Sequence, residues 1–473
     1  MERNRSGGFK VWQLGARVAL MGLLAVAAFG VTPNRAQARD EVGPLTFANP
    51  GGVHRTFSTA GAIDTDNPFF QDLGTNGRTC FTCHRPAQAW TITPVEVRQR
   101  FEQTQGLDPI FRANDGSNCE GADLSTRHSR RKAFSLLLDK GLIRVGLPVP
   151  AAADFDIADV DDPYRCGAPL SDASMFRRPL PTTNLRFLSA VMWDGRETVK
   201  GHAITAGLAT QASHATTGHA QGAAPQEKQL RAIVDFEIGL FTAQSHDREA
   251  GNLTASGATG GPQTLSQQFF CIGINDPLGM LPDMPGACDT VSLVLNTTVF
   301  DLFTSWERSS VRARRTIARG ERLFNTRAFV IDGVGGLNGG AGDPVAGPIK
   351  NGTCTVCHNT PNAGDHSVAM PLNIGLADAS RRTRDLPLYT LRNRTTGDMV
   401  QTTDPGRAMV TGKWSDVGKF KGPILRALAA RAPYFHNGSA ATLADVVEFY
   451  DKRFNIGLTD REKADLVAFL RSL

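Results

Sequence analysis

The chain has 473 residues and a formal net charge of +5. Its first 38 residues hold five basic side chains and one acidic one, so the rest of the chain carries a net charge of only about +1. A nearly neutral protein offers no broad basic surface to a polyanion, which argues against nucleic-acid binding. The remaining length of about 435 residues is enough for two or three domains.

Residues 1–38 are predicted to form a secretory signal peptide. A basic start is followed by an apolar run at 18–31, and Ala36-Gln37-Ala38 offers a cleavage site of small residues. The apolar run has 14 residues, fewer than a membrane-spanning helix needs, and no later stretch is long and apolar enough. We therefore expect a periplasmic protein with a cleaved leader and no stable membrane insertion.

Two Cys-x-x-Cys-His motifs follow, Cys80-Phe-Thr-Cys83-His84 and Cys354-Thr-Val-Cys357-His358. In this pattern the two thiols form thioethers with the vinyl groups of a haem, and the histidine ligates the iron. A zinc site or a redox Cys-x-x-Cys is the alternative, but neither motif has a second Cys pair nearby to complete a zinc site. The motifs therefore predict two covalently bound c-type haems, with His84 and His358 as iron ligands.

The two motifs are 274 residues apart, which is more than one small cytochrome needs. We therefore predict a mainly α fold with two cytochrome c-like haem domains, at residues 39–298 and 299–473, and loop-rich insertions. Residues 105–175, rich in Asp and Pro, are interpreted as an irregular insertion in the first domain. The stretches 251–268 and 333–352, both rich in Gly, are expected to be loops.

Four cysteines remain outside the haem motifs. An even remainder in an exported protein indicates two disulfides. Proximity along the chain favours the pairs Cys119–Cys166 and Cys271–Cys288, although three connectivities are available. Four free thiols are the alternative.

Helical patterns flank the second haem motif. Gly320 and Phe324 share one face of an expected helix, and Thr459 and Glu462 form a capping box that opens the last helix. The Gly-x-x-x-Phe pattern resembles the first helix of small cytochromes c, in which glycine lets the last helix cross closely. This resemblance predicts a cytochrome c fold for residues 299–473.

A second capping box, Thr442-Leu-Ala-Asp445, opens the helix before the last one. On that helix Tyr450 shares the apolar face of Leu443, Val446 and Val447. A buried phenol needs a polar partner, and the iron held by His358 could be that partner, although an ordinary core tyrosine explains the same pattern. Three methionines after the second motif are competing ligands: Met370, Met399 and Met409.

Three further segments resemble the bacterial diheme cytochrome c peroxidases and MauG. They are Trp193-Asp-Gly-Arg196, Phe420-Lys-Gly-Pro-Ile-Leu-Arg426 and Ala432-Pro-Tyr-Phe-His-Asn-Gly438. The resemblance implies that Trp193 lies between the haems, whereas the residue alone could equally be a core tryptophan. It also implies that Tyr450 occupies the position of the axial tyrosine in MauG, which is a methionine in electron-storing peroxidases.

The chain departs from the peroxidase pattern on the N-terminal side. The family's distal histidine is missing, because no histidine follows His84 before His128, and this predicts an open coordination position at the first iron. The family's catalytic glutamate is missing too, because residues 198–226 contain no carboxylate. Gln211, His214 and His219 lie in that stretch, and His219 is the predicted proton shuttle. Solvated loop histidines are the alternative.

The family's site for a calcium ion between the haems also differs. Its asparagine corresponds to Pro179, whereas backbone carbonyls near Arg431 and Pro433 remain. The resemblance therefore allows calcium but does not favour it.

These features predict a peroxidase-like oxidoreductase that reduces hydrogen peroxide. Its electrons would come from a small c-type cytochrome or a cupredoxin. One alternative is a MauG-like enzyme that oxidises a protein or an organic substrate through a high-valent diheme state. A diheme oxygenase that uses dioxygen and a non-catalytic diheme electron carrier are further alternatives.

Overall fold

The computed structural model describes residues 45–270, 274–275, 295–366 and 371–473. The predicted signal peptide, the predicted pair Cys271–Cys288 and the candidate ligand Met370 lie outside the described residues. Within those ranges no helix has the length and apolar character needed to cross a membrane.

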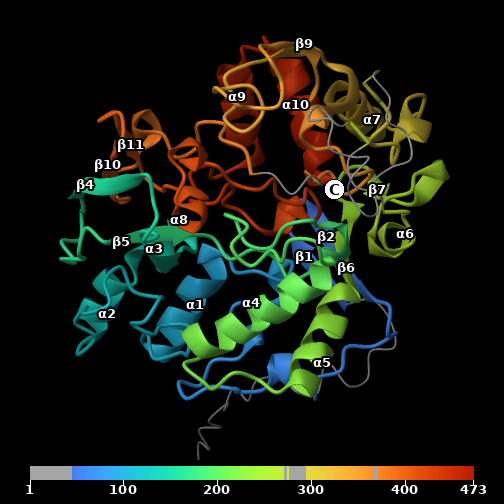
Figure 1. Ribbon diagram of the computed structural model, residues 1–473. Helices are drawn as coiled ribbons and strands as arrows, with labels where there is room; N and C mark the ends of the chain where they lie inside the picture. The colour runs from blue at the N-terminus through green and yellow to red at the C-terminus, as the bar shows by residue number, and fades with distance from the viewer. Residues whose placement is uncertain (1–44, 271–273, 276–294, 367–370) are drawn as a thin grey trace, which may run out of the picture.

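Six helices belong to the N-terminal part of the chain: α1 (Pro94–Thr104), α2 (Arg127–Ala133), α3 (Ser135–Lys140), α4 (Ile204–Gly218), α5 (Glu227–Ile238) and α6 (Pro262–Ser266). Helix α1 begins where the Thr93 side chain accepts a hydrogen bond from Glu96 N, with Pro94 in the first turn. In Figure 1 helices α4 and α5 lie side by side at the bottom of the molecule, and they pack against each other.

The C-terminal part contributes α7 (Arg312–Thr326), α8 (Ala408–Thr411), α9 (Leu443–Phe454) and α10 (Asp460–Arg471). Helices α9 and α10 each start with the predicted capping box, at Thr442 and Asp445 and at Thr459 and Glu462. Together with α7 they enclose an aromatic core in which Phe469 packs edge-on against Phe300. These three helices lie at the top of Figure 1, opposite α4 and α5.

Four small antiparallel sheets connect the helices. The largest has the order β1-β2-β6-β7 and lies between the two helical groups in Figure 1. The second, β11-β10-β4, joins a strand of the N-terminal part to two strands of the C-terminal part, with Tyr389 opposite Val160. The remaining pairs are β3-β5 and β8-β9. The strands are β1 (Leu45–Asn49), β2 (Gly52–Ser58), β3 (Ile143–Pro148), β4 (Phe155–Asp161), β5 (Asp172–Arg177), β6 (Leu240–Asp247), β7 (Gly251–Asn252), β8 (Phe329–Ile331), β9 (Ile349–Gly352), β10 (Leu388–Asn393) and β11 (Met399–Thr402).

The prediction of a mainly α fold is therefore confirmed only in part. Helices form the aromatic core of the C-terminal part, but the sheets hold together segments that are far apart in the sequence. Residues 105–175 include α2, α3, β3 and β4, so this segment contains regular elements. The division into two cytochrome c-like domains stays a prediction.

One of the two predicted disulfides lies in the described residues and is confirmed. Cys119 and Cys166 are bonded, with their Cα atoms 5.3 Å apart. The four cysteines of the haem motifs are free thiols in this structure.

The predicted close crossing at Gly320 is also present. A Cβ atom on Gly320 of α7 would lie 2.0 Å from the carbonyl oxygen of Asp465 and 2.7 Å from Cβ of Phe469, both on α10. The two helices can approach this closely only because the residue has no side chain.

We expect Gly320→Ala to destabilise the protein by about 1–3 kcal/mol, because the added methyl group forces α7 and α10 apart. Chemical denaturation of the holoprotein measures this difference. Gly218→Ala on α4 is the matched control, because a Cβ there meets nothing within 4 Å. Equal stability of the two variants would contradict the close crossing.

Candidate functional site

The first haem motif forms a short 3₁₀ turn at Cys80–Thr82 that is stabilised by reciprocal bonds between Thr79 and Thr82. The backbone N–H of His84 donates to Cys80 O at 3.0 Å, and its ring Nδ1 lies 3.0 Å from Trp90 O. A carbonyl can only accept, so Nδ1 carries the proton and Nε2 keeps its lone pair. Burial lowers the pKa of His84 to about 4, so the ring is neutral at pH 7.

The second motif repeats this geometry. Cys354–Val356 form the 3₁₀ turn, and the backbone N–H of His358 donates to Cys354 O at 3.0 Å. Nδ1 of His358 lies 2.7 Å from Gly364 O, and burial lowers its pKa to about 4. The two turns therefore present two neutral imidazoles, each with Nε2 left for a metal.

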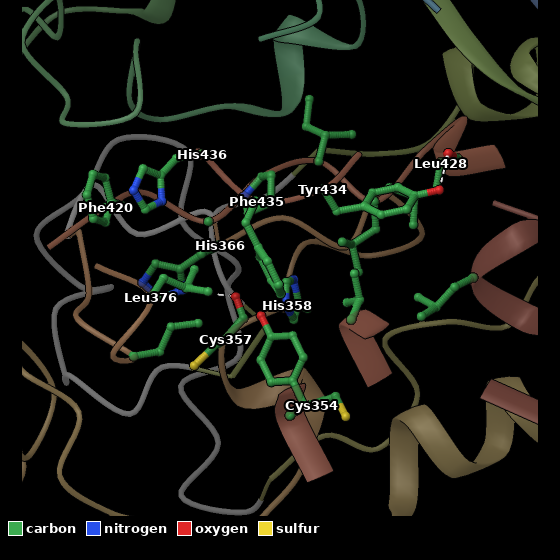
Figure 2. Close-up of a pocket in the computed structure, with 18 of the residues that line it drawn as sticks. Cys354, Cys357, His358, His366, Leu376, Phe420, Leu428, Tyr434, Phe435 and His436 are labelled. Carbon is green, nitrogen blue, oxygen red and sulfur yellow. Dashed lines mark hydrogen bonds between the residues drawn. The ribbon is translucent and has the colours of Figure 1, made fainter. Parts of the chain in front are cut away.

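Each turn opens onto a large, mainly apolar cavity. The first cavity holds about 1,380 Å³ of empty space and is lined by Cys80, Cys83 and His84. The second holds about 1,790 Å³ and is lined by Cys354, Cys357 and His358, which Figure 2 shows gathered at its base. Both values include space open to solvent, and both exceed the roughly 300–1,000 Å³ of ordinary ligand pockets. Free thiols, a neutral imidazole and apolar walls fit a covalently attached haem in each cavity.

Tyr450 reaches the second cavity from α9. Its ring centroid lies 6.4 Å from that of His358, with the rings nearly perpendicular, and it also stacks on Phe454. Its hydroxyl forms no hydrogen bond within the described part of the chain, and burial raises the pKa of the phenol. The tyrosine is thus a packing residue whose polar group lines the cavity. Met399 is exposed and Met409 belongs to a different core, so neither lines this cavity.

The wall between the two cavities is shared. Pro179, Leu180, Pro181, Lys421 and Ile424 line both of them.

Trp193 follows the same wall. Met192 lines the first cavity and Trp193 lines the second. The indole is 8% exposed, donates from Nε1 to Arg178 O at 2.8 Å, and packs edge-on against His436. The structure therefore places Trp193 in the partition that separates the two cavities.

The predicted distal residues differ in their positions. Gln211 and His219 line the first cavity, from α4 and from the residue that ends it. His214 does not line it, because its side chain is 65% exposed and pairs with Glu197.

His219 is held by a carboxylate that sequence reasoning missed. Its Nδ1 is hydrogen-bonded to Asp115, and the second oxygen of Asp115 pairs with Arg78 at 2.5 Å. Burial alone would raise the pKa of Asp115, but the bond to His219 and the charge of Arg78 outweigh it and lower the pKa. Asp115 is therefore ionised at neutral pH, and it orients the His219 ring at the cavity wall.

A second missed carboxyl group is Glu237 on α5. It lines the first cavity, is 3% exposed, and its Oε2 has no hydrogen-bond partner among the described residues. Burial raises its pKa to about 8, so it is protonated at neutral pH. Its place on the apolar face of α5, next to Ile233 and Val234, was a signal that the sequence did contain.

No protein-family model matches this sequence. It is 36% identical over 140 residues to cytochrome-c peroxidase IdrP1 of Denitromonas iodatirespirans, which covers 25% of this chain and 36% of that protein. It is 32% identical over 126 residues to cytochrome c551 peroxidase of Nitrosomonas europaea, which covers 26% of this chain and 31% of that protein. The chain is a relative of the bacterial cytochrome-c peroxidases. The predicted resemblance to these oxidoreductases is confirmed, and the matched region spans about a third of the length of these relatives.

Among solved structures, a MauG-like protein associated with microbial copper homeostasis aligns with 90% of this chain and 93% of its own. The TM-score of that alignment is 0.38 and the sequence identity is 15%. The hydrazine synthase of Kuenenia stuttgartiensis aligns with 81% of this chain and 93% of its own, at a TM-score of 0.31.

The pair formed by Asp115 and Arg78 leads to a stability prediction. Asp115→Asn should lower the free energy of unfolding at neutral pH by about 3 kcal/mol, because it leaves the Arg78 charge buried without its partner. The folded pKa of Asp115 lies below the unfolded value, so its stabilisation is present at neutral pH and is lost as the pH falls. Wild type and variant should therefore converge below about pH 4 in urea denaturation.

Asp156→Asn serves as the control, because Asp156 pairs with Arg392 at the surface. Such an exposed pair contributes at most about 1 kcal/mol. A pH-independent difference between wild type and Asp115→Asn would show that the charge of Asp115 is not the cause.

Proposed function

We propose that the chain is a diheme c-type peroxidase of the periplasm. It would reduce hydrogen peroxide in the first cavity with electrons from a small c-type cytochrome or a cupredoxin. One observation supports this most: two haem-attachment turns open onto two cavities that share one wall, and Trp193 stands in that wall. A carrier that only transfers electrons does not need a proton-bearing cavity at one of its haems.

When bound, each haem supplies the redox chemistry, and the residues of the chain supply its position and its protons. The cysteines hold the two groups covalently, while His84 and His358 offer one neutral nitrogen to each iron. The indole of Trp193 offers a short route for electrons through the partition. Reduction of one peroxide to two waters consumes two electrons and two protons, so the first cavity must also deliver protons.

His219 has the position and the partner for that delivery. With Nδ1 on Asp115, its Nε2 is left to exchange a proton with a peroxide in the first cavity. A histidine oriented in this way is a competent general acid and base near neutral pH. Gln211, on the same side of the cavity, has an amide that can orient the peroxide by hydrogen bonding.

His219→Ala should reduce the steady-state turnover of hydrogen peroxide by about 10²–10⁴-fold, the usual contribution of a general acid or base. The assay follows the oxidation of a reduced small cytochrome c. His214→Ala is the matched control, because it lies on the same helix, pairs with Glu197 and does not line the cavity. Equal loss in both variants, or no loss in either, would remove His219 from proton transfer.

The second candidate function is MauG-like oxidation of a protein or an organic substrate. The hydroxyl of Tyr450 on the wall of the second cavity favours it, because an axial phenolate lowers the reduction potential of a haem and disfavours an electron-entry role. Efficient turnover with peroxide and reduced cytochrome c supports the peroxidase. A lack of turnover in a protein that still consumes peroxide supports the second candidate.

Tyr450→Phe tests whether the phenol is an iron ligand. Electron paramagnetic resonance of the ferric protein should lose the signal of the haem bound by His358 and gain a different one. Tyr434→Phe is the control, because its hydroxyl lies on the same cavity but donates to Leu428 O at 2.8 Å (Figure 2). That control should keep the wild-type spectrum and lose about 1 kcal/mol of stability. A wild-type spectrum for Tyr450→Phe as well would exclude the phenol from the iron.

A further inference from the structure

Three cationic side chains line the second cavity at its junction with the first. They are Arg178, Lys421 and Arg431, and they are 5%, 6% and 9% exposed. Lys421 also lines the first cavity. We refer to these three residues as the basic cluster.

The basic cluster lacks the anionic partners that buried cations normally have. Neither Arg178 nor Arg431 has a carboxylate of the described residues near enough to shift its pKa, and Lys421 has only Asp365, beyond salt-bridge distance. Arg177, the neighbour of Arg178, shows the usual arrangement, with Asp194 at 2.5 Å and Asp404 at 2.7 Å.

The charges in the basic cluster also oppose one another. Burial, followed by the charge of Arg431, lowers the pKa of Arg178 to about 9. The same two effects, set against the attraction of Asp365, lower the pKa of Lys421 to about 8. A guanidinium group stays protonated at neutral pH, so this wall holds at least two buried positive charges that the protein does not neutralise. Such a wall calls for anions from a ligand.

We infer that Arg178, Lys421 and Arg431 bind the propionate carboxylates of the two haems where the cavities meet. This inference rests on the haems of the proposed function. Each haem carries two propionates, and these would be the anions that the wall lacks. Arg431 has a donor to offer, because its buried Nε makes no hydrogen bond within the described residues. Its Nη2 donates to Ile424 O, which holds the side chain in place.

The basic cluster also occupies the place that the family resemblance allows for calcium. The guanidinium of Arg178 donates to Ile92 O at 2.7 Å, Lys140 O at 2.8 Å and Arg431 O at 3.2 Å. A calcium ion needs six to eight oxygen ligands, and here the converging carbonyls already bind a cation. Pro179 has no side-chain oxygen to add, and the described residues contain no group of three His, Cys, Asp or Glu that could hold a metal. Calcium does not fit, and Arg178 supplies the positive charge instead.

Redox titration of the holoprotein tests the propionate site. Arg431→Met and Lys421→Met should each lower the midpoint potential of at least one haem, because loss of a nearby positive charge favours the more positive ferric state. Arg431→Lys keeps the charge and should restore most of the shift. Arg231→Gln on α5, whose side chain is 70% exposed, removes a distant charge and should leave both potentials unchanged.

The outcomes separate this inference from the proposed function. Unchanged potentials in both Met variants, with two haems bound, would overturn the propionate site whatever the peroxide turnover. A chain that binds no haem would overturn the proposed function itself. If a Met variant fails to fold, Arg431→Lys and Lys421→Arg give the comparison, since both keep the charge and should keep the wild-type potentials.

Calcium is tested on the wild-type holoprotein by calorimetric titration with CaCl₂ and by redox titration with and without EGTA. We expect no binding heat and the same potentials in both conditions. A saturable calcium site whose removal by EGTA shifts either potential would overturn the role of Arg178 as the cation at this position.

Discussion

The arrangement depends on one hydrogen bond that occurs twice. In each attachment turn Nδ1 of the histidine donates to a carbonyl six residues further along, Trp90 in the first turn and Gly364 in the second. This bond fixes the plane and the tautomer of the ring and leaves Nε2 as its acceptor. Because burial keeps both rings neutral, each nitrogen retains its lone pair at the pH at which the protein works.

The orientation of the two rings matters because their cavities meet. The backbone crosses the partition at Met192 and Trp193, and Trp193 O accepts a hydrogen bond from Lys421 N at 2.8 Å. The same short segment therefore positions the indole and the lysine that lines both cavities. Loss of either imidazole bond would turn one group away from this wall, while the indole would stay where it is.

Sequence patterns predicted what is local. The capping box at Thr442 and the close crossing at Gly320 each follow from residues within one turn or from one missing side chain, and both are present. The sheets were missed because strands such as β4 pair with distant strands, and no local pattern encodes that pairing. Asp115 was missed for the same reason, since it lies 104 residues before the histidine that it orients. The attachment turns were predictable because their chemistry is contiguous.

The charges of the two cavities differ in a way that fits two separate tasks. The first cavity is lined by groups that can exchange protons: His219 held by Asp115, and the protonated carboxyl of Glu237. The second is lined by fixed cations, Arg178 and Arg431, whose guanidinium groups stay charged. A reaction that consumes protons needs the first kind of wall, whereas retention of anionic groups at a constant charge needs the second. Proton exchange and charge compensation are therefore assigned to opposite sides of one partition, and the indole of Trp193 connects them without carrying a charge of its own.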